Sequence, residues 1–323
     1  MYRRHRLHGK MVEKMKSVLI FGIGGFVGRY VAKEFHENGY NIYGSDIACS
    51  PSLPGWIDFQ AADLLDMDAV SELIAKTKPD IIINLAAISS VWVSWNMPQT
   101  TMQVNVIGAL NILEAIRTLD IGIKVLFIGS SEEYQTVDHP IDEQVPLNAN
   151  NPYGISKMAQ AKFCDTYRSK YGMKIYYVRP FNHTGIGQSE SFVLPSFCKQ
   201  VAQIEMSGKP GIIKVGNLSV ARDFCDVRDV TRAYRMIVES DKCANTYNVG
   251  SGTAYPLIDL LTFIVSLSTK SIDIQVDPER FRPAENQIIQ CDNRYIKREL
   301  GWEPRIDLYD TLRDMYAYYC RAI

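Results

Sequence analysis

The stretch Ser17-Val-Leu-Ile-Phe-Gly-Ile-Gly-Gly-Phe-Val-Gly28 decides the fold of this chain. It begins as a short apolar run typical of a buried strand, and it passes through glycines into a helical pattern. Such glycines let the backbone approach a pyrophosphate closely, and a helix N-terminus offers free amides. We therefore expect a dinucleotide cofactor to contact Gly22, Gly25, Phe26, Val27 and Gly28. An ordinary glycine-rich turn is the alternative.

Short apolar runs alternate with longer amphipathic segments from residue 17 onward. The runs expected to form strands are residues 17–22, 41–45, 57–61, 80–86, 123–129 and 174–179. Strands that alternate with helices indicate a parallel sheet covered on both faces. We therefore expect an α/β fold, a Rossmann-type doubly wound parallel sheet, over residues 17–180 as the dinucleotide-binding domain.

The pattern changes after Pro180 to shorter, mixed pieces. Helices are expected at 191–206, 229–240, 256–268 and 307–320, and strands at 211–215 and 245–249. We expect residues 181–323 to form mainly a smaller substrate-binding α/β part, with some segments returning to the main sheet. Residues 1–16 form a basic leader without the apolar core of a signal peptide, so we expect a disordered extension. A phosphate-binding arm is the alternative.

Composition excludes several classes of protein. The chain has 323 residues, is 46% hydrophobic and carries a formal net charge of −1, which gives no reason to expect nucleic acid or membrane binding. Its seven cysteines form no Cys-x-x-Cys pair, and an odd count without a secretion signal fits a reducing cytosol. We expect a cytoplasmic protein without a metal site.

A second motif lies in the run Asn151-Pro-Tyr-Gly-Ile-Ser-Lys157. If Asn151 and Pro152 open a helix, Tyr153 and Lys157 are i and i+4 on it and project from one face. A free tyrosine titrates near ~10, and lowering this pKa to ~7 needs about 4 kcal/mol, which an ammonium plus a cofactor cation can supply. We therefore predict that Tyr153 is a general acid, with Ser130 upstream as its partner. An amphipathic helix with no catalytic role is the alternative.

Asp46 closes the second expected strand, where a carboxylate can accept hydrogen bonds from an adenosine ribose and would repel a 2'-phosphate. This position favours NAD(H) over NADP(H). The alternative is a turn in which Asp46 caps its own loop.

Two more strand ends are expected to meet the cofactor. Asp63 and Leu64 follow the third strand and could contact the adenine, and Asn84 ends the fourth strand. The side chains expected beside the cofactor there are Leu85 and the small Ala86 and Ala87. The alternative for each of these residues is that it only ends its strand and does not contact a cofactor.

Taken together, the glycine motif, Asn84-Leu-Ala-Ala87, Ser130 and Tyr153-x-x-x-Lys157 resemble the extended short-chain dehydrogenase/reductases that act on nucleotide sugars. The resemblance covers residues 17–321. More specific motifs resemble the branch that holds GDP-mannose 4,6-dehydratase and GDP-4-keto-6-deoxy-mannose reductase. They are Gly129-Ser-Ser-Glu-Glu-Tyr134, Arg179-Pro-Phe-Asn-His183, Ile213-Lys-Val-Gly-Asn-Leu218, Ala221-Arg-Asp-Phe224 and Arg282-Pro-Ala-Glu285. The resemblance implies a nucleotide-sugar substrate linked to GDP.

Arginines in the second half suit a sugar diphosphate, because a planar guanidinium can bind its oxygens with several donors. Arg222 and Arg282 are candidates, and surface ion pairs with Asp223 or Glu285 are the alternative. The resemblance implies that both arginines contact the pyrophosphate. It further implies substrate contacts from Ser131, from Asn182 to the diphosphate, from Val193 to the nucleotide and from Glu285 to the ribose, with Lys199 and Lys214 less certain.

Glu132 bears on the choice of reaction. In the dehydratases of this family a glutamate at its position removes a proton beside the keto carbon, and Glu132 could do so here. Yet the Ser-Ser-Glu-Glu-Tyr form and the stretch from Phe181 to Asp229 look more like the reductase. We therefore expect an NAD(P)H-dependent 4-keto reductase. The alternatives are the dehydratase, a nucleotide-sugar epimerase and, outside the enzymes, a dinucleotide-binding sensor.

Two positions depart from the family pattern. Gln135 stands where a glycine usually follows the tyrosine, and Asp46-Ile47 stands where relatives offer Ser-Arg or arginines for NADP.

Relatives form a homodimer through helices that correspond to residues 98–118 and 153–171. The apolar candidates here are Leu110, Ile112, Leu113, Ala161, Phe163 and Tyr167. We expect a homodimer, although these side chains could equally pack on their own sheet.

Overall fold

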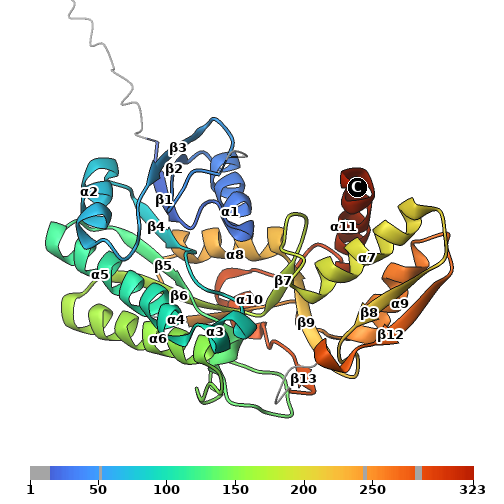
Figure 1. Cartoon of the computed structure of the whole chain (residues 1–323). Helices are drawn as coiled ribbons and strands as arrows, with labels where there is room; N and C mark the ends of the chain where they lie inside the picture. Colours follow the sequence, from blue (N-terminus) through green and yellow to red (C-terminus); the bar gives the residue numbers. More distant parts are fainter. Residues whose placement is uncertain (1–14, 51–52, 243–245, 281–285) are drawn as a thin grey trace, which may run out of the picture.

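The computed structural model describes residues 15–50, 53–242, 246–280 and 286–323. Arg282, Glu285 and nearly all of the basic leader lie outside the described residues. Figure 1 shows a larger part built around a central sheet and a smaller part made of later elements, drawn mostly in yellow to red.

The central sheet is parallel, and among the described residues it has seven strands in the order β10-β6-β5-β4-β1-β2-β3. These are β1 (Ser17–Phe21), β2 (Asn41–Asp46), β3 (Ile57–Ala61), β4 (Ile81–Asn84), β5 (Lys124–Ile128), β6 (Lys174–Pro180) and β10 (Thr246–Val249). The doubly wound Rossmann-type fold is confirmed. The fourth strand ends at Asn84 rather than at residue 86, because the backbone of Ala86 turns to pack against Gly22.

Helices cover both faces of this sheet. One face carries α1 (Phe26–Glu37), α8 (Val227–Glu239) and α10 (Arg294–Leu300), and the other carries α2 (Met67–Thr77), α5 (Gly108–Leu119) and α6 (Pro152–Tyr171). Alternate strand residues point to opposite faces. Thus Val18 packs with α1 and α8, while Leu19 packs with α2 and α5. The short α3 (Val91–Asn96), α4 (Pro98–Met102) and a π-helical turn (Gln103–Ile107) lead into α5.

Two segments after residue 180 belong to the larger part. Strand β10 pairs in parallel with β6, and α8 packs with α1 on the same face. Tyr247 and Val249 of β10 are fully buried. Their burial beside β6 explains why this segment extends the main sheet instead of the smaller part.

The smaller part has its own core. Its helices are α7 (Val193–Ser207), α9 (Leu257–Ser266) and α11 (Leu308–Ala322), and its strands are β7 (Asn182–Thr184), β8 (Gly211–Val215), β9 (Ala221–Asp226), β11 (Ala254–Pro256), β12 (Ile272–Val276) and β13 (Ile288–Ile289). The three helices pack together around side chains such as Phe197, Leu261 and Leu312. The strand β9 was not expected, because its sequence Ala-Arg-Asp-Phe-Cys-Asp has three charged residues and no regular alternation of apolar and polar side chains.

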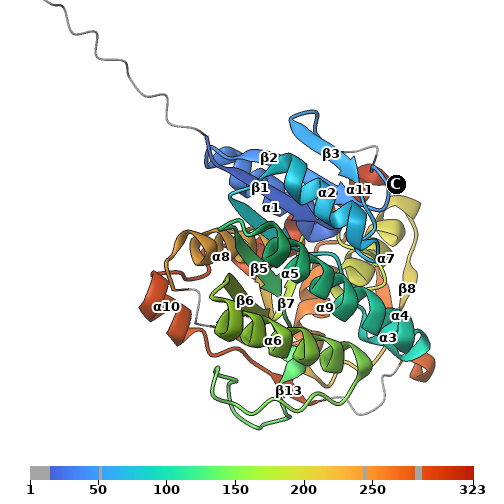
Figure 2. The same ribbon diagram turned by 90° about the vertical axis from the view of Figure 1, so that its left-hand side faces the viewer.

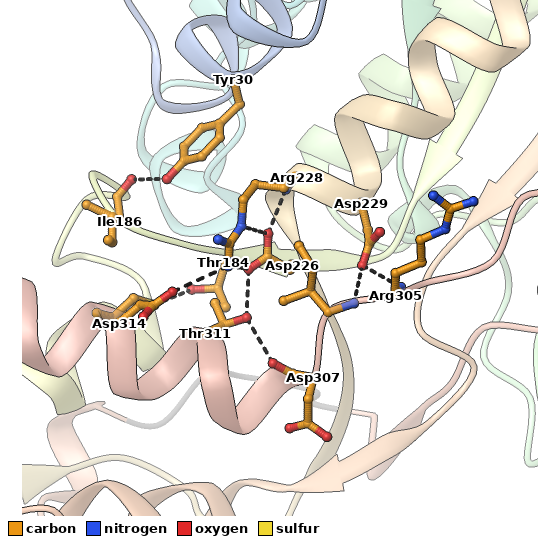
Figure 3. Close-up of polar contacts among 12 residues, drawn as sticks. Tyr30, Thr184, Ile186, Asp226, Arg228, Asp229, Arg305, Asp307, Thr311 and Asp314 are labelled. Atoms are coloured by element: carbon orange, nitrogen blue, oxygen red, sulfur yellow. Dashed lines mark hydrogen bonds and ion pairs between the residues drawn. The ribbon is translucent and has the colours of Figure 1, made fainter.

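A polar cluster around Asp226 joins the two parts (Figure 3). The Asp226 carboxylate is buried, and it accepts hydrogen bonds from the Arg228 side chain at 2.7 Å and from the Thr311 hydroxyl of α11 at 2.7 Å. It also caps α8 by accepting from the Arg228 amide. Tyr30 of α1 donates to the carbonyl of Ile186 at 2.8 Å. Elements far apart in the sequence are therefore held together by specific hydrogen bonds.

Replacing Asp226 by alanine is expected to lower the free energy of unfolding by about 3 kcal/mol, because a helix cap and charge-assisted hydrogen bonds are lost together. Urea unfolding followed by circular dichroism measures this change. The matched control is Asp310→Ala, whose ion pair with Arg313 is exposed and contributes less than about 1 kcal/mol. Equal losses for the two variants would contradict a joining role for Asp226.

Candidate active site

The glycine turn between β1 and α1 lies where the strand order reverses, at the carboxyl ends of the strands, where such folds bind ligands. A Cβ at Gly22 would lie 2.7 Å from the amide nitrogen of Ala86, and Gly22 has a φ of +79°. Gly25 caps α1 without a side-chain hydrogen bond, and Phe26, Val27 and Gly28 begin the helix. The turn thus presents backbone amides at a helix N-terminus, which suits a pyrophosphate.

Asp46 ends β2 beside this turn. Its Oδ2 accepts from the Gly24 amide at 3.1 Å, and its Oδ1 accepts from the Ile47 amide at 2.9 Å. The carboxylate therefore caps its own loop and also faces the glycine turn. Each oxygen has further lone-pair capacity for a ribose hydroxyl.

Asp63 and Leu64 follow β3. Asp63 accepts from the Leu65 amide at 2.9 Å, while the Leu64 side chain is buried in the core against Gly108 of α5. A cofactor could therefore meet Asp63 or the Leu64 backbone, but the Leu64 side chain faces the core.

The segment after β4 carries Leu85, Ala86 and Ala87 past the glycine turn, since the Leu85 amide donates to the Phe21 carbonyl at 3.0 Å and Ala86 lies against Gly22. Asn84 is buried, and its Oδ1 has no hydrogen-bond partner among the described residues. Asn105 exchanges hydrogen bonds with the backbone of Ile88 and donates to Ser156 of α6 at 2.9 Å. The glycine turn, Asp46 and an unpartnered buried oxygen together fit a dinucleotide cofactor.

Helix α6 places Tyr153 and Lys157 on one buried face. Asn151 caps the helix by accepting from the Gly154 amide at 2.9 Å, and Pro152 occupies its first turn. Both side chains are largely buried, Tyr153 at 8% and Lys157 at 3% exposure. The Lys157 ammonium donates to the carbonyl of Ile128 at 2.7 Å, which ties α6 to the end of β5.

Ser130 follows β5 and caps the short 3-10 turn Ser131–Glu133 (η2). Its hydroxyl accepts from the Glu132 amide at 3.1 Å and is hydrogen-bonded to the side chain of Tyr153. The fold therefore brings Ser130, Tyr153 and Lys157 together from two elements distant in the sequence. A phenol beside a serine hydroxyl and a lysine is an arrangement that can serve in proton transfer.

Burial raises the pKa of Tyr153, while the hydrogen bond with Ser130 opposes this and the charges of Glu132 and Glu133 add to it. The prediction that Lys157 and a cofactor cation together lower this pKa concerns the protein with its cofactor bound, and it stays a prediction. In the described structure the Lys157 ammonium donates to the Ile128 carbonyl, and burial lowers its own pKa to about 8. Tyr153 is accordingly protonated at neutral pH and able to donate.

Glu132 lies on η2, two residues after Ser130. Its Oε2 accepts from the side-chain amide of Asn151 at 2.8 Å, so the helix cap and this carboxylate are linked. A pocket beside it is also lined by Ser131, Gln135, Thr136, Asn150 and Asn286. Gln135, which departs from the family pattern, thus borders the same pocket as Glu132.

The candidate substrate residues come from the smaller part. Asn182 on β7 is exposed, Val193 begins α7, and the Arg222 side chain of β9 donates to the Ala221 and Gln287 carbonyls. The neighbouring His183 ring stacks on Phe26 with centroids 6.4 Å apart, which brings β7 against the cofactor turn. Lys199 pairs with Glu190, and Lys214 is exposed. Arg282 and Glu285 lie outside the described residues.

The carboxylate of Asp223 does not serve as a surface partner for Arg222. It is fully buried and accepts hydrogen bonds from the amides of Ser251, Gly252 and Cys291. The suggested ion pair between these two neighbours is therefore wrong, because adjacent strand residues point to opposite faces.

Sequence reasoning missed Glu133 and Arg179, which form a buried ion pair beneath Ser130 with a nitrogen–oxygen distance of 2.8 Å. Two consecutive glutamates give no signal as to which one is buried.

Among the described residues there is no cluster of His, Cys, Asp or Glu suited to a metal ion. No helix in these ranges is long and apolar enough to cross a membrane.

Comparison with known proteins finds a matching family and relatives that are similar to this chain in sequence. The model of a family described as GDP-mannose 4,6 dehydratase matches residues 19–315. A GDP-6-deoxy-D-mannose reductase of Pseudomonas aeruginosa is 32% identical over 78% of this chain and 83% of its own length. A GDP-mannose 4,6-dehydratase of Vibrio cholerae is 29% identical over 94% of this chain and 93% of its own length.

The fold is also similar to that of solved structures. The structure of RMD from Pseudomonas aeruginosa complexed with NADPH superposes with a TM-score of 0.82 and 27% identity, and it covers 95% of this chain and 100% of that one. The similarity thus extends over both parts of the chain.

Proposed function

Since this chain belongs to the GDP-mannose 4,6-dehydratase family, we propose that it is a nicotinamide-dependent reductase of the 4-keto group of a GDP-4-keto-6-deoxy-hexose. The observation that carries the proposal is the buried arrangement of Ser130, Tyr153 and Lys157 at the edge of the sheet where the glycine turn lies. The reductase named above supports this choice of reaction and substrate class.

In this mechanism a reduced nicotinamide held at the glycine turn would supply the hydride for C4 of the sugar. The protonated Tyr153 gives its phenolic proton to the C4 oxygen as that oxygen gains negative charge. Ser130, which is already hydrogen-bonded to Tyr153, donates to the same oxygen. The Lys157 ammonium would stabilise the phenolate left behind, and it would hold the ribose of the nicotinamide when the cofactor is bound.

A dehydratase is the second candidate, because Glu132 borders a pocket and its carboxylate could remove a proton. The related dehydratase covers nearly the whole chain. Against it, the hydrogen bond from Asn151 occupies one oxygen of Glu132, and the Ser-Ser-Glu-Glu-Tyr form resembles the reductases.

Two incubations separate these reactions. The enzyme is mixed with NADH or NADPH and GDP-4-keto-6-deoxy-mannose, and separately with GDP-mannose and oxidised cofactor. A reductase oxidises NAD(P)H only with the keto sugar. Loss of GDP-mannose without net cofactor change would instead identify a dehydratase, and no turnover of either sugar would favour a sensor or an epimerase of another sugar.

We propose NAD(H) as the cofactor, although the related structure holds NADPH. The Asp46 carboxylate beside the glycine turn would repel a 2'-phosphate. We expect NADH to bind at least about tenfold more tightly than NADPH. The substitution Asp46→Asn should reduce the ratio of the two dissociation constants. The control Asp58→Asn, at an exposed position, should leave that ratio unchanged. Fluorescence titration measures both constants. Tighter binding of NADPH by the natural chain would show that Asp46 is only a turn residue.

The rate should depend on the charge of Lys157. Because burial lowers the pKa of Lys157 to about 8, its ammonium form is present below that pH and is lost as the pH rises through it. We therefore expect kcat/KM for the keto sugar to fall about tenfold per unit above pH 8. A profile that stays level to pH 9.5 would contradict this role, since an ordinary lysine titrates near ~10.4.

We also propose a homodimer formed through α5 and α6. Three of the expected contact residues, Ile112, Leu113 and Ala161, are buried in the core of their own chain. Phe163 of α6 and the α3 side chains Trp92 and Trp95 are exposed and supply apolar surface. Small-angle scattering at micromolar concentration measures the mass, and a monomer would contradict the proposal.

We place the protein in the cytoplasm as a further proposal. Its support is that the cysteines of the described part are free thiols, four of them buried. Fractionation of cells followed by immunodetection tests this, and recovery outside the cytoplasm would reject it.

A further inference from the structure

The side chain of Glu133 is fully buried and contacts the backbone of Ser130, next to the proposed proton donor Tyr153. The mechanism above does not use this carboxylate. Its Oε1 accepts from the Ser130 amide at 2.8 Å and from the Tyr177 hydroxyl at 2.9 Å. Its Oε2 accepts from Nε of Arg179 at 2.8 Å. Glu133 thus accepts three hydrogen bonds, one of them from a guanidinium.

The first link runs from Glu133 to Ser130. The glutamate binds the backbone amide of Ser130 while the Ser130 hydroxyl binds the amide of Glu132, as in a capping box. Gly129 permits this approach, because a Cβ there would lie 2.3 Å from Oε1 of Glu133. The position of the Ser130 hydroxyl beside Tyr153 therefore depends on Glu133.

The second link runs to Lys157. The Tyr177 hydroxyl lies within hydrogen-bond distance of both Glu133 and the backbone carbonyl of Lys157, at 2.9 Å each. The buried Lys157 ammonium has one described hydrogen-bond acceptor, the neutral Ile128 carbonyl. Glu133 supplies a compensating negative charge, which opposes the effect of burial on the pKa of Lys157.

The ion pair with Arg179 lowers the free-energy cost of burying the Glu133 carboxylate. The Arg179 side chain is only 9% exposed, and besides Glu133 it donates to the Tyr134 hydroxyl at 3.2 Å. Tyr134 in turn donates to Asn248 of β10 at 2.7 Å. The network thus extends from the catalytic turn to the far edge of the sheet, which explains why Glu133 keeps one position.

We propose that Glu133, held by Arg179, is a positioning residue for the reductase reaction: it fixes Ser130 beside Tyr153 and keeps Lys157 in its ammonium form. This inference rests on the proposed function for its kinetic consequence. Its effect on Lys157 can be measured without any substrate.

Other groups around Lys157 do not replace this charge. The groups whose charge acts on the pKa of Lys157 are Glu133 of η2 and Cys164 of α6, and Tyr177 of β6 contacts the backbone carbonyl of Lys157. Burial raises the pKa of the Tyr177, Cys164 and Tyr153 side chains, so these three are neutral near pH 8. Removing the charge of Glu133 therefore moves the titration of Lys157 to lower pH.

The test uses the double variant Glu133→Leu/Arg179→Met, which removes both charges and leaves neither partner buried alone. Lysines are labelled with 13C, and the Cε signal of Lys157, assigned through Lys157→Met, is followed against pH. We expect its midpoint to fall by about one unit. We also expect kcat to fall at least tenfold while the KM for the sugar changes less than threefold, because Ser130 loses its support.

The exposed pair offers a matched control, Asp310→Leu/Arg313→Met, for which both readouts stay unchanged. The single variant Glu133→Gln is a second test and moves the midpoint in the same direction. The proposal would be overturned if the titration midpoint of Lys157 did not shift. It would also be overturned if the double variant did not fold, because Glu133 would then have a structural role alone. Failure of the proposed function would be visible separately, as absence of reductase activity in the natural chain.

Discussion

Replacing Tyr153 by phenylalanine is expected to lower kcat for the keto sugar by about 1000-fold, the upper part of the range for losing a general acid. The change removes one oxygen atom, and burial of the ring is retained. Because burial raises the pKa of Tyr153, its proton is in place at neutral pH, and Ser130 has no comparable proton to give. The loss should therefore appear in kcat, while the affinity for NADH changes less than about threefold, since Lys157 and the glycine turn are untouched.

Stopped-flow oxidation of NADH at saturating keto sugar measures this effect. The control is Tyr171→Phe at the end of the same helix, whose ring is exposed and meets Arg117 and Lys170. It should leave kcat unchanged. Turnover by Tyr153→Phe at the rate of the natural chain would remove Tyr153 from the mechanism and, with it, the reductase assignment of this site.

Replacing Gly28 by alanine is expected to weaken NADH binding by at least about 100-fold, which corresponds to about 2.7 kcal/mol. A Cβ at this position would lie 2.5 Å from the carbonyl oxygen of Ile23 and 2.6 Å from that of Gly22. Both obstacles are backbone atoms, so the turn itself must open. The helix N-terminus then moves away from the place where a pyrophosphate would lie.

Fluorescence titration with NADH measures this loss, and circular dichroism checks that the fold is retained. Gly122→Ala serves as the control, because a Cβ at Gly122 meets nothing within 4 Å. If Gly28→Ala bound NADH as tightly as the control, the glycine turn would not be the cofactor site.

Much of the central fold could be predicted because its signals are local. The apolar run Ser17–Phe21, the glycines after it and the cap at Asn151 each act within a few residues, and the structure forms the expected elements there. The spacing of Tyr153 and Lys157 also predicted their shared face, since a helix repeats every 3.6 residues. The dinucleotide fold and the family followed from these motifs.

The charge state of the site could not be predicted from local sequence signals. Whether Tyr153 is acidified depends on how deeply it is buried and on where the Lys157 ammonium points, and both follow from the packing of α6 against β5. The return of β10 to the sheet and the burial of Asp223 likewise depend on partners distant in the chain. Such contacts leave no periodic pattern in the sequence.

By itself, therefore, the sequence determined the parallel sheet, the glycine turn and which residue types stand at the ends of its strands. Tertiary structure alone decided which of two adjacent glutamates faces the interior and that Glu133, paired with Arg179, supports Ser130. The physical reason is that backbone propensity acts over a few residues, whereas burial and charge compensation depend on groups that only folding brings together.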